Sequence, residues 1–386
     1  MAVEPFAVGF DLGKEYSQIC CWNADTKEPV SISVVAGAEK YRIPTESLEL
    51  FLKKAMRLLK PFGKVHEAEA VVFSVEETAE ERVEEIRRTA MQLMGVPESR
   101  IFVQTREESF CAYVLSQPRE IWRHQTVLFI CEGELLEAVV LHVGTRTVPF
   151  LARTERQESW RRPISGLEPE DKDEILCEMA REIFSERAVS SVFLVGEGFE
   201  DKWYEQALRV LCGSGRRVFA GNNLFAKGAC CRAIQEAGLN GGRTYVFLDG
   251  DKISYNVGLR TPGTGKNAIY TLLEAGESWY EAKAECEALL CGDSAVEFIL
   301  KPMQGGDTLK ETLALPGLPD RPSRATRLRI SAEFLSVDRL RVQVSDLGFG
   351  ELFPSSDLTW SEEVDLGGPV AQPAGESRLP GTWAEG

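Results

Sequence analysis

The spacing of hydrophobic residues in the first 240 positions predicts alternating strands and helices. Runs of alternating or β-branched residues predict three consecutive strands at 6–11, 16–22 and 30–35. The next segment, 45–63, instead places its apolar residues on one helical stripe and ends in Pro-Phe-Gly. The same criteria predict strands at 69–75 and 100–104 and helices at 78–94 and 107–116.

The same order of elements recurs between residues 122 and 239. In sequence, it predicts strands at 126–131, 135–143 and 147–152, a helix at 170–187, a strand at 191–195, a helix at 200–212, a strand at 216–220 and a helix at 223–237. A repeat of this length indicates a duplicated domain, because each copy has enough elements for its own mixed sheet. We therefore expect two α/β halves, at 1–121 and 122–239.

After residue 238 the pattern changes to short strands separated by Gly-rich turns. This pattern predicts a β-sandwich over 240–362. From 363 to 386 Gly, Pro and Glu dominate, which predicts a disordered tail. The stretch "SDLGFGELFPSS", residues 345–356, has two interpretations: a strand with a bulge and a turn, or a lip that binds a partner.

The composition narrows the classes of function. Acidic residues outnumber basic ones by 60 to 44, and the net charge of -16 disfavours sequence-independent binding of nucleic acid or of an anionic membrane. The chain starts without the pattern of a signal peptide, and no apolar run reaches the length of a membrane helix, about 18 residues, so we expect a cytoplasmic protein. Ten cysteines without a CxxC pair and only three histidines predict reduced thiols and argue against a zinc centre.

Four short segments of the two halves carry a resemblance to a known superfamily. They are "VGFDLGKEYSQICCW" (8–22), "TREESFCAYVLSQ" (105–117), "VFLVGEGFEDKW" (192–203) and "NNLFAKGACCRAI" (222–234). In that order they resemble the first phosphate loop, the helix after Asn-Glu-Pro-Thr, the adenosine strand and loop, and the helix that closes the adenine pocket in the actin, hexokinase and heat-shock ATPase superfamily. Within it the chain most resembles the seventy-kilodalton heat-shock chaperones (DnaK-like), because 312–351 is similar to the end of their β-sandwich substrate-binding domain.

The resemblance implies two ribonuclease-H-like (actin-like ATPase) halves around a trimmed cleft, followed by a β-sandwich without a helical lid. It also implies where a nucleotide would be held, at the matching residues Asp11, Gly13, Lys14, Gly133, Gly196, Gly198 and Lys227. Asp11 is the catalytic candidate, because in an ATPase it would orient magnesium-bound water. Gly196 and Gly198 have a structural alternative, in which they end a strand and admit a helix N-terminus.

Several residues depart from that nucleotide site. The second phosphate loop reads "FICEGELLEA" (129–138), with Glu132 and Glu134 where the superfamily has small residues. A carboxylate about 4 Å from a phosphate oxygen would repel it by about 4 kcal/mol at an effective dielectric near 20. In the first loop, Lys14 and Glu15 replace paired threonines. Lys14 then has three interpretations: an internal ion pair with Glu132 or Glu134 in place of nucleotide, a contact with bound phosphate, or a plain exposed charge.

These departures favour a protein without enzymatic activity. We expect a heat-shock-chaperone-like pseudo-ATPase that acts as a scaffold and binds a protein or an extended peptide at its β-domain. No cofactor is expected for this function. The alternative is a weak ATPase or nucleotide-dependent switch that binds ATP and magnesium at low affinity, and a second alternative is a structural subunit of a larger assembly.

Overall fold

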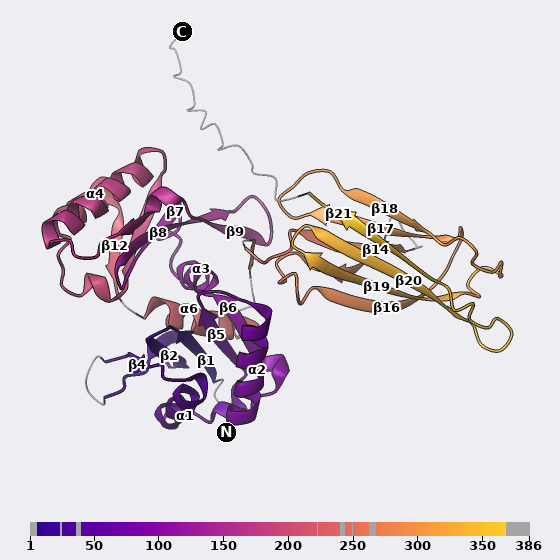
Figure 1. The fold of residues 1–386 in the computed structure, drawn as a ribbon, viewed down its shortest axis with the longest axis horizontal. Helices are drawn as coiled ribbons and strands as arrows, with labels where there is room; N and C mark the ends of the chain where they lie inside the picture. Colours follow the sequence, from indigo (N-terminus) through magenta and orange to yellow (C-terminus); the bar gives the residue numbers. More distant parts are fainter. Residues whose placement is uncertain are drawn as a thin grey trace, which may run out of the picture. The chain divides into compact units, whose positions relative to one another are not determined.

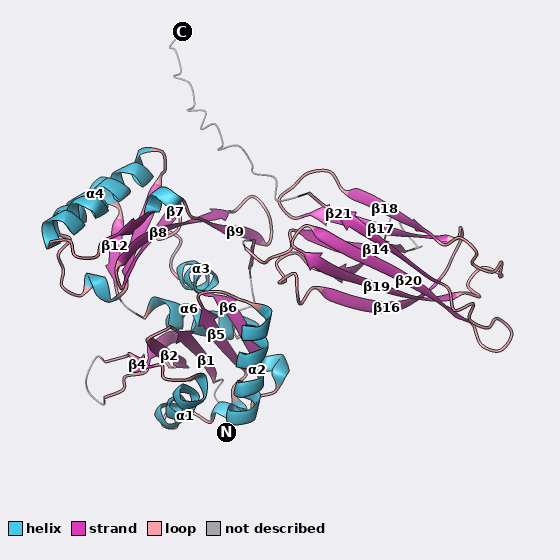
Figure 2. Ribbon diagram, viewed as in Figure 1, coloured by secondary structure: helices cyan, strands magenta, loops and turns pink. Residues whose placement is uncertain are grey.

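The computed structural model describes residues 6–23, 25–35, 40–221, 223–239, 244–248, 250–261 and 268–367. The chain forms two compact units, Met1–Asp249 (unit 1) and Gly250–Gly386 (unit 2). Figure 1 colours them along the sequence, and Figure 2 shows that unit 1 mixes helices and strands, whereas the drawn elements of unit 2 are strands and loops. A mixed α/β chain with several sheets and a β-rich C-terminal part, as the sequence predicts, is therefore confirmed.

The first sheet of unit 1 is mixed, with both antiparallel and parallel strand pairs. Its strands are β1 (Ala7–Leu12), β2 (Tyr16–Asn23), β3 (Glu28–Ser31), β4 (Ile43–Pro44), β5 (Ala70–Val75) and β6 (Ile101–Thr105). The order is β3-β2-β1-β5-β6, and β4 pairs with β2. Strand β1 is antiparallel to β2 and parallel to β5, which is parallel to β6. All six residues of β1 are buried, as expected for a central strand covered on both faces.

The second sheet repeats this arrangement. Its strands are β7 (Gln125–Glu132), β8 (Leu135–Gly144), β9 (Phe150–Glu155), β10 (Arg161–Pro163), β11 (Val189–Val195), β12 (Arg217–Ala220) and β13 (Tyr245–Phe247). The order is β12-β11-β7-β8-β9-β13, with β7 antiparallel to β8 and parallel to β11. Strand β7 therefore takes the place of β1. Strand β13 falls in the segment predicted as β-sandwich, but it pairs with β9 and completes this sheet.

Most helices of unit 1 lie within a few residues of their predicted positions. The α-helices are α1 (Leu48–Leu59), α2 (Glu80–Met94), α3 (Arg106–Ser116), α4 (Pro169–Ser185), α5 (Glu205–Leu211) and α6 (Leu224–Glu236), and the 3-10 helices are η1 (Val65–Glu67), η2 (Glu98–Arg100), η3 (Glu158–Trp160), η4 (Glu197–Phe199) and η5 (Gly213–Gly215). The helix predicted at 200–212 was wrong at its start. Asp173 of α4 accepts 2.7 Å hydrogen bonds from the N–H groups of Gln206 and Ala207, and so caps α5.

In the described part of the chain, no helix combines the length and the apolar character needed to cross a membrane.

Helices α3 and α6 join the two halves of unit 1. Helix α6 packs its small residues on the first sheet, and α3 contributes Phe110 and Val114 to the core beneath the second sheet. Figure 1 shows both helices between the two sheets. They contact each other so closely that a Cβ added to Gly228 would lie 1.8 Å from the carbonyl oxygen of Ser109. Each half therefore covers part of its sheet with a helix from the other half.

Unit 2 consists of two four-stranded antiparallel sheets that share one core. Their strands are β14 (Tyr255–Thr261), β15 (Ala268–Leu273), β16 (Lys283–Leu289), β17 (Ala295–Pro302), β18 (Leu309–Ala314), β19 (Arg327–Ser336), β20 (Arg339–Gly348) and β21 (Thr359–Asp365). The orders are β15-β14-β17-β18 and β16-β19-β20-β21. Residues such as Phe298 of one sheet and Ile330 of the other belong to the same buried cluster, because alternate side chains of every strand point inward.

The end of unit 2 differs in part from the prediction. Segment 345–356 forms the end of β20 and a turn, in which Phe349 bridges to Phe353 and Leu352 is 86% exposed. Strand β21 continues to Asp365, so the first three residues of the tail predicted as disordered lie in a strand. From residue 368 onward, that predicted tail lies outside the described residues.

Candidate functional site

A pocket of about 370 Å³ lies between the two halves of unit 1, at the carboxyl ends of their central strands. Asp11 is the next-to-last residue of β1, while Glu76 and Arg106 directly follow β5 and β6. From the second half, Glu132 ends β7 and Gly196 follows β11. Because ligands of α/β sheets bind beyond the carboxyl ends of parallel strands, this pocket is the candidate functional site.

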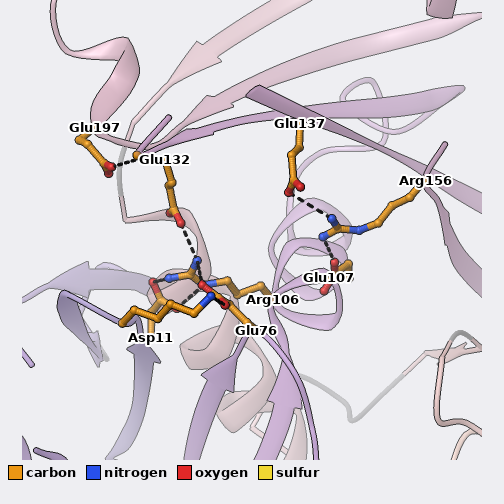
Figure 3. Close-up of polar contacts among 10 residues, drawn as sticks. Asp11, Glu76, Arg106, Glu107, Glu132, Glu137, Arg156 and Glu197 are labelled. Carbon is orange, nitrogen blue, oxygen red and sulfur yellow. Dashed lines mark hydrogen bonds and ion pairs between the residues drawn. The ribbon is translucent and has the colours of Figure 1, made fainter. Parts of the chain in front are cut away.

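The pocket is built around the guanidinium of Arg106 (Figure 3). Its Nε and Nη2 donate to both carboxylate oxygens of Asp11, at 2.9 and 3.1 Å. Its Nη1 donates to Glu132 at 3.0 Å and lies 3.7 Å from Glu76. The guanidinium also lies over the ring of Phe225, 4.9 Å from its centroid. One buried arginine therefore joins carboxylates of both halves.

The start of helix α3 holds Arg106 in this position. Thr105 is the N-cap of α3 and accepts a hydrogen bond from the N–H of Glu108, whose carboxylate accepts one from the N–H of Thr105. Arg106 is the first residue of the helix and is 8% exposed. A Cβ added to Gly13 would lie 3.1 Å from Nη2 of Arg106, so a side chain there would crowd the guanidinium.

The positive charge of Arg106 compensates only part of the negative charge of the carboxylates beside it. Burial raises the pKa of Asp11, and the nearby guanidinium of Arg106 opposes that rise only in part. Burial likewise raises the pKa of Glu132, against the same opposing charge. One guanidinium is shared among three carboxylates here, since Glu76 also faces it.

The turn between β7 and β8, which the resemblance matched to a second phosphate loop, is contacted by a carboxylate of the chain itself. The N–H of Gly133, at the turn between β7 and β8, donates to Oε1 of Glu197 at 2.7 Å. Gly196 and Gly198 pack against the end of β7, where added Cβ atoms would lie 2.1 Å from the carbonyl oxygen and from Sγ of Cys131, respectively. Both glycines thus have a packing role against Cys131, which is a separate role from the alternative expected from the sequence, a strand end that admits a helix N-terminus.

Further ion pairs connect the two halves beside the pocket. Arg156 of the second half pairs with Glu107 of α3 and, at 3.4 Å, with Glu137 (Figure 3). Arg42 of the first half pairs with Glu200 at 2.8 Å. The cleft is therefore crossed by charged side chains of the chain at several points.

The structure brings together five of the residues predicted to bind nucleotide. Asp11, Gly13, Lys14, Gly133 and Gly196 line the pocket. Gly198 and Lys227 do not line the pocket. Gly198 packs on Cys131, and Lys227 lies on α6.

Of the three interpretations of Lys14, the ion pair with Glu132 or Glu134 is wrong in its partner. Lys14 is 84% exposed at its side chain and pairs with Glu76 at 2.7 Å, whereas Glu132 pairs with Arg106. Sequence reasoning missed Arg106, although Arg106 lies in segment 105–117, which carries part of the resemblance. The available signal was its position: Arg106 follows a parallel strand, as Asp11 ends one, and such positions meet at one edge of a sheet.

A family described as "Family of unknown function (DUF5716) C-terminal" matches residues 45–250, and a "Domain of unknown function (DUF8552)" matches residues 252–366. No curated protein matches the chain. Similar solved structures include a glucokinase from an Antarctic psychrotroph (8% identity, TM-score 0.35, covering 59% of this chain and 98% of that chain). Others are an inorganic polyphosphate/ATP-glucomannokinase from Arthrobacter sp. strain KM (12%, 0.38, 61% and 100%) and a ROK hexokinase from Thermus thermophilus (15%, 0.33, 58% and 97%).

The TM-scores of these three structures are too low to carry an argument about the fold of this chain. They give no support to the narrower resemblance to heat-shock chaperones. Because all three TM-scores lie below 0.5, we draw nothing about activity from them.

Proposed function

We propose a function from the pocket of unit 1, because this chain belongs to the DUF5716 C-terminal family, whose description specifies no activity. Unit 1 is a pseudo-ATPase, which works without catalysis. The observation behind this proposal is the set of contacts of Arg106 with Asp11 and Glu132. The chain's own cation and carboxylates fill the position where an ATPase of this type would hold magnesium and phosphates.

Arg106 makes catalysis at Asp11 unfavourable. Both carboxylate oxygens of Asp11 accept hydrogen bonds from Arg106, which leaves one lone pair on each and reduces the capacity of Asp11 to orient magnesium-bound water. Releasing Asp11 would leave its buried carboxylate without its counter-charge, while Arg106 would keep Glu132, and this costs about 1–3 kcal/mol. A weak ATPase would have to recover that free energy from bound nucleotide.

The other side of the pocket is unfavourable for phosphate. The N–H of Gly133 already donates to Glu197, an anion that takes the place of a phosphate oxygen. Glu132 and Glu76 add negative charge within reach of the same position. A triphosphate would therefore meet both repulsion and a lost hydrogen bond.

We propose that the whole chain is a scaffold, in which unit 2 binds a protein or an extended peptide. The order of the parts, two similar α/β halves followed by a β-sandwich, supports a chaperone-like organisation. In unit 2, edge strand β15 exposes two apolar side chains, Ile269 (50%) and Tyr270 (53%). Such an edge offers backbone hydrogen bonds and apolar contacts to an added strand.

Calorimetric titration with MgATP and MgADP tests the pseudo-ATPase. We expect no binding at millimolar nucleotide for the wild type. The double variant Arg106→Ala with Glu132→Gly removes the occupying groups and should gain affinity, whereas Arg156→Ala, which removes a different inter-half ion pair, should not. Micromolar binding by the wild type, about -8 kcal/mol, or an ATPase rate that disappears in Asp11→Asn, would overturn the proposal.

Binding of reduced, alkylated lactalbumin, a permanently unfolded chain, tests the role of unit 2. The full-length protein should bind it, and Ile269→Ser with Tyr270→Ser should weaken binding. Leu352→Ser is the matched control, because Leu352 is an exposed apolar residue of unit 2 that lies outside the edge strand. Equal binding by all three proteins would contradict a site at β15.

A further inference from the structure

The pocket of unit 1 has more acidic than basic side chains. The lining residues of each kind are Asp11, Glu15, Glu76, Glu132, Glu137 and Glu197 against Lys14, Arg42, Arg106 and Arg161. Lys14 and Arg161 are more than half exposed at their side chains, and Arg42 pairs with Glu200, which does not line the pocket. Three carboxylates, those of Asp11, Glu76 and Glu132, face the guanidinium of Arg106, which is the most deeply buried of the four cations.

A second observation in the pocket is the side chain of Gln18. It lies on β2 directly opposite Asp11 in the strand pair, so both side chains project from the same face of the sheet. Gln18 is 6% exposed and lines the pocket. Among the described residues, none forms a hydrogen bond with its buried Oε1. A buried acceptor without a partner is rare in native proteins and indicates that a donor is supplied from elsewhere.

Two other glutamines show why the position of Gln18 matters. Oε1 of Gln125 and Oε1 of Gln235 are also buried without a partner among the described residues, but neither side chain lines the pocket. Only for Gln18, of these three, does the unpartnered oxygen coincide with a cavity and with neighbouring carboxylates. The cavity, about 370 Å³, falls within the usual size of small-molecule sites, about 300–1,000 Å³.

The chemistry of these groups selects the ligand. Oε1 of Gln18 needs a hydrogen-bond donor, and Asp11 and Glu132 would be stabilised by a positive charge, since burial raises the pKa of both. An ammonium group supplies both, with three donors and one charge. Anions such as phosphates are excluded by the same carboxylates, and the described residues contain no His, Cys, Asp or Glu group of three or more that could hold a metal ion.

We propose that this pocket binds a small aliphatic primary amine, with its ammonium group between Gln18, Asp11 and Glu132. The pocket also contains apolar surface for the hydrocarbon part of such a ligand, from Ile130, Leu135 and Phe225. The inference rests on the proposed function, because it assigns to the amine a cleft that is closed to nucleotide. Unit 1 is then a binding module whose cleft has exchanged an anionic ligand for a cationic one.

Calorimetric titration of the full chain with putrescine, butylamine and 1,4-butanediol tests the proposal. Butanediol matches putrescine in length and in its ability to donate, but it is uncharged. We expect both amines to bind at pH 8 with a Kd of about 1 mM or tighter, and the diol not to bind. Failure of both amines to bind, or equal binding of the diol, would overturn the inference. So would heat from magnesium chloride alone at the same site, shown by competition with putrescine.

Two substitutions place the site at Gln18. Gln18→Met keeps the length of the side chain but removes the acceptor, and it should weaken putrescine binding by about tenfold or more. Gln125→Met makes the same change at a glutamine outside the pocket and should leave the Kd within about twofold. Equal weakening by the two variants would contradict the site. If Gln18→Met does not fold, the comparison of putrescine with butanediol on the wild type still decides the outcome.

The nucleotide titration separates the two proposals. Binding of MgATP by the wild type overturns the pseudo-ATPase, whatever the amines do. If neither MgATP nor an amine binds, the pseudo-ATPase stands and the amine site alone is wrong.

Discussion

Two buried arginine–aspartate pairs in this protein are both bidentate, one through Nη1 and Nη2 of Arg321 and the other through Nε and Nη2 of Arg106, but their surroundings differ. In unit 2, Arg321 donates to both oxygens of Asp346 at 2.8 Å. In unit 1, Arg106 donates to both oxygens of Asp11 at 2.9 and 3.1 Å. The difference lies in what else contacts each carboxylate.

Asp346 is fully satisfied by its own loop. It also accepts hydrogen bonds from the N–H groups of Gly348 and Ser356 and from the hydroxyl of Ser356. Burial would raise the pKa of Asp346, but hydrogen bonds from Arg321, Gly348 and Ser356 outweigh burial and hold this pKa well below its usual range. Arg321 also donates to the carbonyl oxygen of Pro354, so the pair fixes the turn after β20.

Asp11, in contrast, shares its arginine with Glu132 and faces a cavity. Its pKa is raised instead of lowered. The comparison teaches that the residue types of an ion pair do not define its role. A pair whose carboxylate is saturated by backbone and hydroxyl donors stabilises a loop, whereas an incompletely compensated pair beside a pocket indicates a place for a ligand.

The largest expected effect is the loss of the pair in unit 2. Asp346→Asn leaves Arg321 buried without its counter-charge and should lower the free energy of unfolding of unit 2 by about 3–5 kcal/mol. Hydrogen exchange of the β19 and β20 amides measures this change. A loss below about 1 kcal/mol would show that the loop does not depend on the pair.

Loss of the Arg106–Asp11 pair should lower the free energy of unfolding of unit 1 by less than loss of the Arg321–Asp346 pair lowers that of unit 2. Arg106→Gln should lower the free energy of unfolding of unit 1 by about 1–3 kcal/mol, because Asp11 and Glu132 can take up protons and water can enter the pocket. Exchange of the β1 and β5 amides measures it, and the loss should be smaller at pH 5.5 than at pH 8. A loss equal to that of Asp346→Asn at both pH values would remove the contrast between the pairs.

The two aspartates should also give opposite dependence of stability on pH. The lowered pKa of Asp346 means that the unfolded chain binds its proton more tightly, so this contribution is fully present above the unfolded pKa, about 3.9, and is lost as the pH falls from there through the folded pKa. The raised pKa of Asp11 means the reverse, so its contribution is present below about 3.9 and is lost as the pH rises through the folded pKa.

Urea unfolding between pH 3 and 7, compared for wild type, Asp346→Asn and Asp11→Asn, measures these slopes. Asp346→Asn should remove a rise of stability with pH, and Asp11→Asn should remove a fall. The same sign of change in both variants would contradict the assignment of the two sites.

The smallest effect belongs to a third, exposed pair. Arg156 is 47% exposed at its side chain, so Arg156→Ala should change the free energy of unfolding by less than about 1 kcal/mol, and 0.5 M salt should reduce even that. Thermal unfolding at low and high salt measures it. A loss above about 2 kcal/mol would contradict the small effect expected of an exposed pair and would give the contact of Arg156 with Glu107 a larger part in holding the halves together.

Periodicity alone predicted much of the fold. The continuous apolar runs in β1 and β2 and the period near 3.6 in α1 follow from which faces must be buried, and that requirement is local. The start of α5 was missed because its cap, Asp173, lies 33 residues away on α4. A cap supplied from another helix leaves no signal in the neighbouring residues.

The sequence by itself determined the acidic character of the cleft and the presence of Asp11 and Gly133 at strand ends, because these depend on local turns and on charge. It predicted that an internal ion pair could replace nucleotide, but it assigned the pair to Lys14. Arg106 could be identified only from the tertiary structure, because its partner Asp11 is 95 residues away. Only packing distinguishes its buried guanidinium from the exposed side chain of Lys14. Local patterns specify which charges approach the cleft, and the assembled sheets decide which of them are buried, because burial depends on residues from every strand.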